Sequence, residues 1–199
     1  GRHVVKVTVL MSDAWHPVVP FIEDWAGEMG AFGFDVTILY DKTQLSGGDI
    51  LFLISFREIL EKRFRDKFGL TMVVHASDLP AGKGWSPHIW QIIEGASNIV
   101  VSLIEAEDYV DSGRVVAKTA FDLKGDELLE EINQRLFAAE TKLMTFALKN
   151  YKDLDPVPQP DRPASSYPRR SPEDSRLDPE KTISEQFNLL RIVDNERYP

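Results

Sequence analysis

Two residues of this sequence have side chains suited to proton transfer, and each follows a segment that could place it at a ligand site. His75 comes directly after the apolar run 71–74, and Asp111 ends the acidic stretch 105–111. An imidazole can stabilise a developing oxyanion, and a nearby carboxylate can take up a proton. Each residue also has an ordinary alternative role. A histidine can cap a helix or complete a turn, and an aspartate before Ser-Gly is a common turn residue.

Two further polar groups follow apolar runs in the same way. Trp15 and His16 belong to the group at residues 12–16, and Arg57 belongs to the group at residues 55–57. In an open parallel sheet, ligands bind beyond the carboxyl ends of the strands, so these positions are candidates for a binding site. For Trp15 and His16 the alternative is plain packing of a loop aromatic.

The segments that would position these residues alternate between strand and helix patterns. Apolar runs typical of strands buried on both faces occupy residues 4–10, 35–40 and 49–55. A fourth apolar run lies at residues 71–74, and two further strands are predicted at 98–104 and 114–121. Helical patterns occupy residues 18–29, 57–68, 87–95 and 126–150. Because short helices between strands favour parallel pairing, we predict an α/β fold with a doubly wound, mostly parallel sheet in residues 1–150.

Composition and charge narrow the class of protein. The chain has 199 residues, of which 43% are apolar, and this excludes collagen, coiled coil and wholesale disorder. A formal charge of −9 opposes a nonspecific nucleic-acid binder. Without cysteine, apolar runs of membrane-spanning length or a signal-peptide pattern, we expect a cytoplasmic protein with no membrane partner. No two histidines have metal-ligand spacing, so no metal site is expected.

The last quarter of the chain differs in composition from the rest. Eight of the 12 prolines lie beyond residue 155, while no glycine lies beyond Gly125. Proline restricts φ, so we predict that residues 151–199 form a stiff arm docked on the main domain, with a helix at residues 182–193. Tyr167, Arg169 and Arg170 in this arm could bind a nucleotide by stacking and by guanidinium pairing with a diphosphate. They could equally hold the arm in place by surface ion pairs.

Several motifs together resemble the formyltransferase family that uses 10-formyltetrahydrofolate. They are His-Ala-Ser-Asp-Leu-Pro at residues 75–80, Gly-Trp-Ser-Pro at 84–87 and Val-Asp-Ser-Gly at 110–113, and the match covers about residues 48–122. The run Tyr-Pro-Arg-Arg-Ser-Pro-Glu-Asp at 167–174 and the C-terminal segment 186–191 are similar to nucleotide-sugar N-formyltransferases. Within that group, the sequences of these motifs are most similar to the formyltransferase of pseudaminic-acid synthesis.

The resemblance implies a role for each of the candidate residues. His75 and Asp111 would be catalytic, and 10-formyltetrahydrofolate would be the formyl donor. Folate would be held by the segment 55–60 and the loop that follows residue 105, and these folate-binding residues are Phe56, Ile59, Leu60, Ala106, Glu107 and Asp108. The amino-sugar nucleotide would be bound by Trp15, His16, Arg57, Ser77, Tyr167, Arg169 and Arg170.

One position departs from the family pattern. The family usually has an asparagine two residues before the histidine, where its amide donates to the formyl oxygen, and this chain has Val73 there. Valine cannot donate a hydrogen bond. Either the alignment slips, or Ser77, Asn98 or a backbone N–H substitutes as the donor, or catalysis is impaired.

The favoured reaction is formylation of the 4-amino group of UDP-4-amino-4,6-dideoxy-N-acetyl-altrosamine. The alternatives are a dTDP-linked amino sugar as acceptor, and a catalytically silent folate-fold binding module. A homodimer is compatible with the sequence. Relatives generally continue beyond the terminal Tyr198-Pro199, so we also expect that a C-terminal piece is missing.

Overall fold

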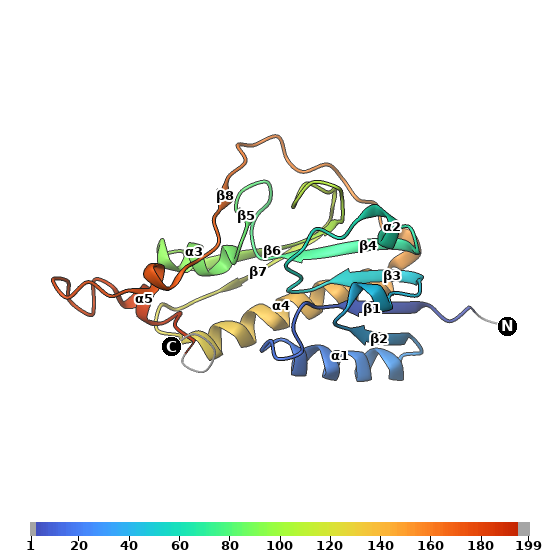
Figure 1. Ribbon diagram of the computed structural model, residues 1–199, viewed down its shortest axis with the longest axis horizontal. Helices are drawn as coiled ribbons and strands as arrows, with labels where there is room; N and C mark the ends of the chain where they lie inside the picture. Colours follow the sequence, from blue (N-terminus) through green and yellow to red (C-terminus); the bar gives the residue numbers. More distant parts are fainter. Residues whose placement is uncertain (1–2, 195–199) are drawn as a thin grey trace.

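The computed structural model describes residues 3–194, and its centre is a six-stranded mixed sheet (Figure 1). The strand order is β2-β1-β3-β4-β6-β7, with β2, β1, β3 and β4 parallel and β6 antiparallel to both of its neighbours. The strands are β1 (Lys6–Leu10), β2 (Asp35–Leu39), β3 (Gly48–Leu53), β4 (Phe68–His75), β6 (Asn98–Glu105) and β7 (Val115–Asp122). The prediction of a doubly wound, mostly parallel α/β sheet is therefore confirmed.

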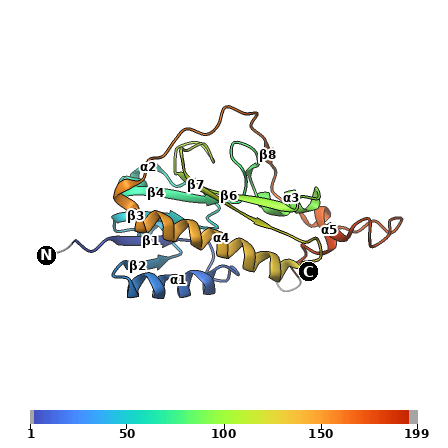
Figure 2. The same ribbon diagram turned by 180° about the vertical axis from the view of Figure 1, so that it is seen from behind.

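Helices cover both faces of this sheet. The helices α1 (Val19–Ala31) and α4 (Leu129–Lys149) lie on one face, and the short α2 (Lys62–Arg65) lies on the other (Figure 2). The rings of Phe21 and Phe137 join α1 to α4 edge to face at 5.1 Å between centroids. Within residues 3–194, no helix has both the length and the apolar character needed to cross a membrane.

Two of the predicted helices are much shorter than their patterns indicated. The prediction of a helix over residues 57–68 is wrong, because only Lys62–Arg65 is helical and β4 already begins at Phe68. The Arg65 side chain binds the carbonyl of Leu60, and Glu61 is extended, so the segment before α2 stays outside a helix. The predicted helix at 182–193 is reduced to α5 (Phe187–Leu190), since the Gln186 side chain closes a turn on Asp178 instead.

The C-terminal arm crosses the α2 side of the molecule and returns to the carboxyl ends of the strands (Figure 1). It contains the 3-10 turns η2 (Tyr151–Asp153) and η3 (Pro172–Ser175) and the short strand β8 (Ser166–Tyr167). β8 pairs in parallel with β5 (Lys83–Gly84), which lies in the loop after β4. This pairing joins the arm to the loop that follows His75.

A buried ion pair fastens the end of the arm to the start of α4. Arg191 and Glu127 are 2% and 1% exposed, and Arg191 Nη2 lies 2.8 Å from Glu127 Oε1. Desolvation acts to raise the pKa of Glu127, but backbone N–H groups of residues 124, 125 and 127 and the charge of Arg135 lower it to about 2. The folded protein therefore holds this carboxylate charged.

We expect acid to remove this contribution to stability. The folded-state pKa of Glu127 lies below the ordinary 4.5, so its stabilisation is complete above pH 4.5 and is lost as the pH falls toward 2. The loss should be about 3 kcal/mol. The free energy of unfolding of wild type and of Glu127→Gln should be measured in urea between pH 4.5 and pH 2. The difference between the two proteins should shrink by about 3 kcal/mol as the pH falls. Glu131→Gln, an exposed α4 carboxylate, is the control, and a difference that stays constant with pH would contradict the prediction.

Candidate active site

His75 and Asp111, which lie 36 positions apart in the sequence, meet at the carboxyl end of β4. His75 is the last residue of β4, and Asp111 occupies a left-handed turn (φ 51°) between β6 and β7. The imidazole Nδ1 lies 3.6 Å from Asp111 Oδ1, and both side chains are 8% exposed. At that distance the two form a contact pair rather than a hydrogen bond, which is common for catalytic groups without bound substrate. Asp111 is thus both a turn residue and a partner of the imidazole.

The loop that contains β5 connects these two residues. His75 Nε2 lies 2.7 Å from the carbonyl oxygen of Gly82, and the Gly84 N–H donates to Asp111 Oδ2 at 2.8 Å. A carbonyl only accepts, so Nε2 carries a proton in this arrangement. Nδ1 then faces the Asp111 carboxylate oxygen. The two side chains are therefore oriented toward each other, as a proton-transfer pair requires.

The arm forms the other side of this loop. The Gly82 N–H donates to Ser165 Oγ at 2.8 Å, and the Lys83 N–H donates to the Ser165 carbonyl at 2.9 Å. The side-chain amide of Gln159 donates to the carbonyls of Asp111 and Gly113, at 2.7 and 3.0 Å. The arm consequently fixes the backbone on both sides of the His75 and Asp111 pair.

No polar side chain stands at the position where the family usually has an asparagine. Val73 packs against apolar residues, among them Leu79. Ser77, 2% exposed, donates its hydroxyl proton to the Ala81 carbonyl at 2.7 Å. Asn98 is wrong as a substitute, because it bonds Asp122 and stands four residues along β6 from Ser102, the partner of His75, which is about 13 Å. Of the substitutes considered, a backbone N–H remains.

The residues expected to bind folate lie on two neighbouring segments that Arg65 ties together. Its Nε and Nη1 donate to the carbonyls of Leu60 and Ala106, both at 3.1 Å, and its Nη2 is paired with Asp108. Leu60 is buried and Phe56 half-buried, whereas Ile59 and Glu107 are exposed. The structure thus brings the segment 56–60 beside the segment 106–108, as a shared binding site requires.

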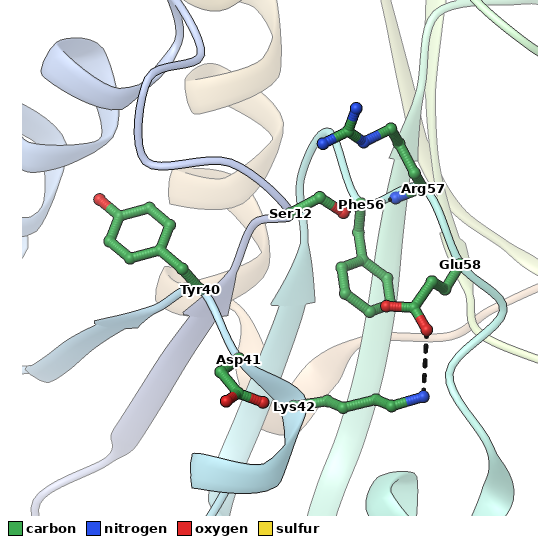
Figure 3. A pocket seen from close by; sticks show the side chains of 7 residues that line it. All are labelled: Ser12, Tyr40, Asp41, Lys42, Phe56, Arg57 and Glu58. Carbon is green, nitrogen blue, oxygen red and sulfur yellow. Dashed lines mark hydrogen bonds and ion pairs between the residues drawn. The ribbon is translucent and has the colours of Figure 1, made fainter.

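A pocket of about 410 Å³ opens where β1, β2 and β3 end (Figure 3). It is lined by Ser12, Tyr40, Asp41, Lys42, Phe56, Arg57 and Glu58. Lys42 reaches Glu58 at 3.0 Å, while the Arg57 side chain points away from both of them (Figure 3). Phe56 and Arg57 thus line a common pocket beside the segment expected to hold folate, and His75 is not among its lining residues.

The three arm residues expected to bind a nucleotide contact tryptophans of the main domain. Tyr167 stacks on Trp90 at 6.0 Å with 6° between the ring planes, and its hydroxyl donates to Glu94. The guanidinium groups of Arg170 and Arg169 lie 5.3 Å and 5.4 Å from the ring centres of Trp90 and Trp85. Trp85, Trp90, Tyr167, Arg169 and Arg170 thus form one of the contacts that dock the arm on the main domain.

The two loop aromatics after β1 differ from each other. Trp15 is 87% exposed, so it does not serve packing within the chain. His16 is half-buried, its Nδ1 accepts from the Val18 N–H at 3.0 Å, and its ring lies 6.1 Å from that of Phe137. Within residues 3–194, no group of three or more His, Asp or Glu side chains is arranged to hold a metal ion.

Sequence reasoning missed Arg65 and Gln159, which organise the two halves of the site. Arg65 stood inside an apparent helix, and Gln159 in a proline-rich stretch without any motif. Apart from Leu60, the partners of these two side chains lie more than 40 positions away along the chain. No local pattern carries such a pairing.

Comparisons with known proteins agree on one family. The family model described as "Formyl transferase" matches residues 36–148. A methionyl-tRNA formyltransferase of Streptococcus agalactiae is 28% identical over 147 residues, or 73% of this chain, and the chain spans 47% of that relative's length.

Solved structures share the fold. A methionyl-tRNA formyltransferase from Clostridium thermocellum aligns with a TM-score of 0.82 at 23% identity, over 98% of this chain and 86% of that one. A sugar 3-N-formyltransferase crystallised in the presence of dTDP and 5-N-formyl-THF aligns with a TM-score of 0.72 at 13% identity, over 96% of this chain and 79% of that one. At these identities the likeness is one of fold.

Two glycines with the same backbone conformation offer a test of the arm contact. A Cβ on Gly84 (φ +95°) would lie 2.4 Å from the Tyr167 carbonyl oxygen, whereas one on Gly95 (φ +93°) would meet nothing within 4 Å. Gly95→Ala should therefore cost only backbone strain of about 1–2 kcal/mol. Gly84→Ala should cost more and should speed proteolysis of residues 156–170, because β8 must leave β5. Equal stability loss and equal cleavage rates in the two variants would contradict the proposed contact.

Proposed function

Because the chain belongs to the formyl transferase family, we propose that it transfers a formyl group from 10-formyltetrahydrofolate to an amine of a nucleotide-linked sugar. The observation that carries this proposal is the His75 and Asp111 pair at the carboxyl end of β4, with 3.6 Å between Nδ1 and Oδ1. The family supplies the reaction class, and the pair supplies the groups the reaction needs.

The reaction has three requirements that these groups meet. The acceptor nitrogen attacks the formyl carbon, a tetrahedral oxyanion forms, and the bond between that carbon and the folate N10 then breaks. The attacking amine loses one proton and N10 gains one. A protonated His75 stabilises the oxyanion and gives its proton to N10 as the bond to N10 breaks. Asp111 balances the imidazolium charge and takes up the proton that the amine loses, directly or through water.

The folate is proposed to lie against the segments 56–60 and 106–108. Arg65 holds the Leu60 and Ala106 carbonyls at fixed positions, which leaves the neighbouring backbone groups to bind the pterin edge. Ile59 and Glu107 project outward and would contact the more exposed part of the ligand. The sugar 3-N-formyltransferase of the same fold, crystallised with 5-N-formyl-THF, supports a reduced folate as the donor class.

The acceptor is proposed to be a nucleotide-linked 4-amino-4,6-dideoxy sugar, with the UDP-linked altrosamine derivative favoured over a dTDP-linked sugar. Two cations stacked on tryptophans, Arg169 and Arg170, suit a diphosphate, and the exposed Trp15 suits a sugar or base. His16 lies in the loop after β1 and would contact the sugar, whereas Ser77 is buried, with its hydroxyl bound to the Ala81 carbonyl, and is left out of the proposed contacts. The formal charge of −9 is compatible with this small anion because the cations are gathered in one place.

A second acceptor, methionyl-tRNA, is favoured by the curated relative that bears that name at 28% identity. Two features oppose it in this chain. The formal net charge of the chain is −9. In the short connection between β2 and β3, the cationic side chain is Lys42, and it is paired with Glu58 and Glu61. An RNA backbone is bound mainly by unpaired cations.

Assays with 10-formyltetrahydrofolate and a panel of acceptors test these proposals. The panel contains UDP-linked and dTDP-linked 4-amino sugars and methionyl-tRNA, and mass spectrometry detects the added formyl group. We expect formylation of an amino sugar, lowered about 100- to 1,000-fold by His75→Ala, because one stabilising donor of the oxyanion is lost. The variant should remain folded, but its melting temperature should fall, because the buried Gly82 carbonyl loses its hydrogen-bond partner.

His3→Ala is the matched control, since His3 is an exposed imidazole that binds Asp49 far from the site. Wild-type turnover in His75→Ala would remove His75 from the mechanism. Formylation of methionyl-tRNA alone would assign the second acceptor. Folate binding without transfer to any amine would identify the silent binding module that Val73 raises as an alternative.

A further inference from the structure

One hydroxyl group in the core of the described chain has no hydrogen-bond partner. Thr71 is 8% exposed, and its Oγ1 is buried and unpaired. Within residues 3–194 the same holds for one other side-chain atom, Nη1 of Arg170. A buried hydroxyl without a partner is unfavourable, and such groups in native proteins call for an explanation, such as a ligand that completes them.

The direction of this hydroxyl follows from the register of the sheet. Thr71 on β4 is paired with Leu51 on β3, so the two side chains lie on the same face. Leu51 belongs to the cluster that contains Leu60 and Phe64, on the face opposite to α1 and α4. Thr71 therefore faces the layer that includes Leu60 and α2.

The backbone of the same residue touches the second folate segment. The Ala106 N–H donates to the Thr71 carbonyl at 2.9 Å. Arg65 connects the carbonyls of Ala106 and Leu60, and both residues contribute to the apolar cluster on the face of the sheet that Thr71 shares with Leu51. The unpaired hydroxyl thus faces the layer to which both segments contribute.

We propose that the Thr71 hydroxyl is a hydrogen-bonding group for the pterin ring of the folate and so contributes to folate specificity. A hydroxyl rotates to donate or to accept, and the edge of a pterin offers both carbonyl and N–H groups. The inference rests on the proposed function, because it needs folate in this place. It assigns a role to an atom that is otherwise unsatisfied in the free protein.

Binding and stability should respond in opposite directions to Thr71→Val. Valine keeps the shape of threonine and removes the hydroxyl, so the affinity for 5-formyltetrahydrofolate should fall about ten-fold, measured by calorimetry as Kd. The same substitution should raise the melting temperature of the ligand-free protein, because an unpaired polar atom leaves the core. Thr71→Ser keeps the hydroxyl and should bind folate within about three-fold of wild type.

Thr8→Val is the matched control. Thr8 is equally buried, at 8% exposure, and its register with Leu51 places it on the same face, on β1 rather than β4. Its Kd should match that of wild type. An unchanged Kd in Thr71→Val, or a lower melting temperature of its ligand-free form, would overturn the inference. Failure of wild type itself to bind any reduced folate would instead overturn the proposed function.

Discussion

The backbone of residues 82–84 is the constraint on which the site depends. Its Gly82 carbonyl accepts from His75, and its Gly84 N–H donates to Asp111. Its remaining polar groups reach the arm, through Ser165 and through the pairing of β5 with β8. Movement of this loop would therefore separate the imidazole from the carboxylate and release the arm together. The same loop therefore positions His75 and Asp111 and holds the arm.

A buried ion pair, away from the His75 and Asp111 pair, also holds the arm in place. Glu127 is held ionised by backbone N–H groups and two arginines, which anchors the end of the arm. Glu140, on the buried face of α4, has no such partners within residues 3–194, and desolvation raises its pKa to about 8. One buried carboxyl thus stabilises the fold as an anion, while the other stays neutral at pH 7. The difference lies in whether hydrogen-bond donors accompany the charge into the core.

Much of the fold could be predicted from the sequence, because apolar runs and helix-ending glycines are local signals. The strands from Lys6 to Leu10 and from Asn98 to Glu105 differ from their predicted bounds by one or two residues. The segment before Lys62 could not be predicted, since the Arg65 side chain that binds its Leu60 carbonyl is itself held by the distant Ala106 carbonyl. The meeting of His75 with Asp111 was expected only through family resemblance. A turn residue and a strand end carry no local sign that they meet.

The alternation of β4 explains how one strand can serve both halves of the proposed reaction. Thr71, Val73 and His75 lie on one face at intervals of about 6.6 Å. The row begins at the layer that contains the segments proposed to bind folate, and it ends at the His75 and Asp111 pair. Val73 between them packs against apolar residues of two clusters and offers no hydrogen bond. In the proposed reaction, stabilisation of the oxyanion would therefore depend on His75 and on backbone N–H groups.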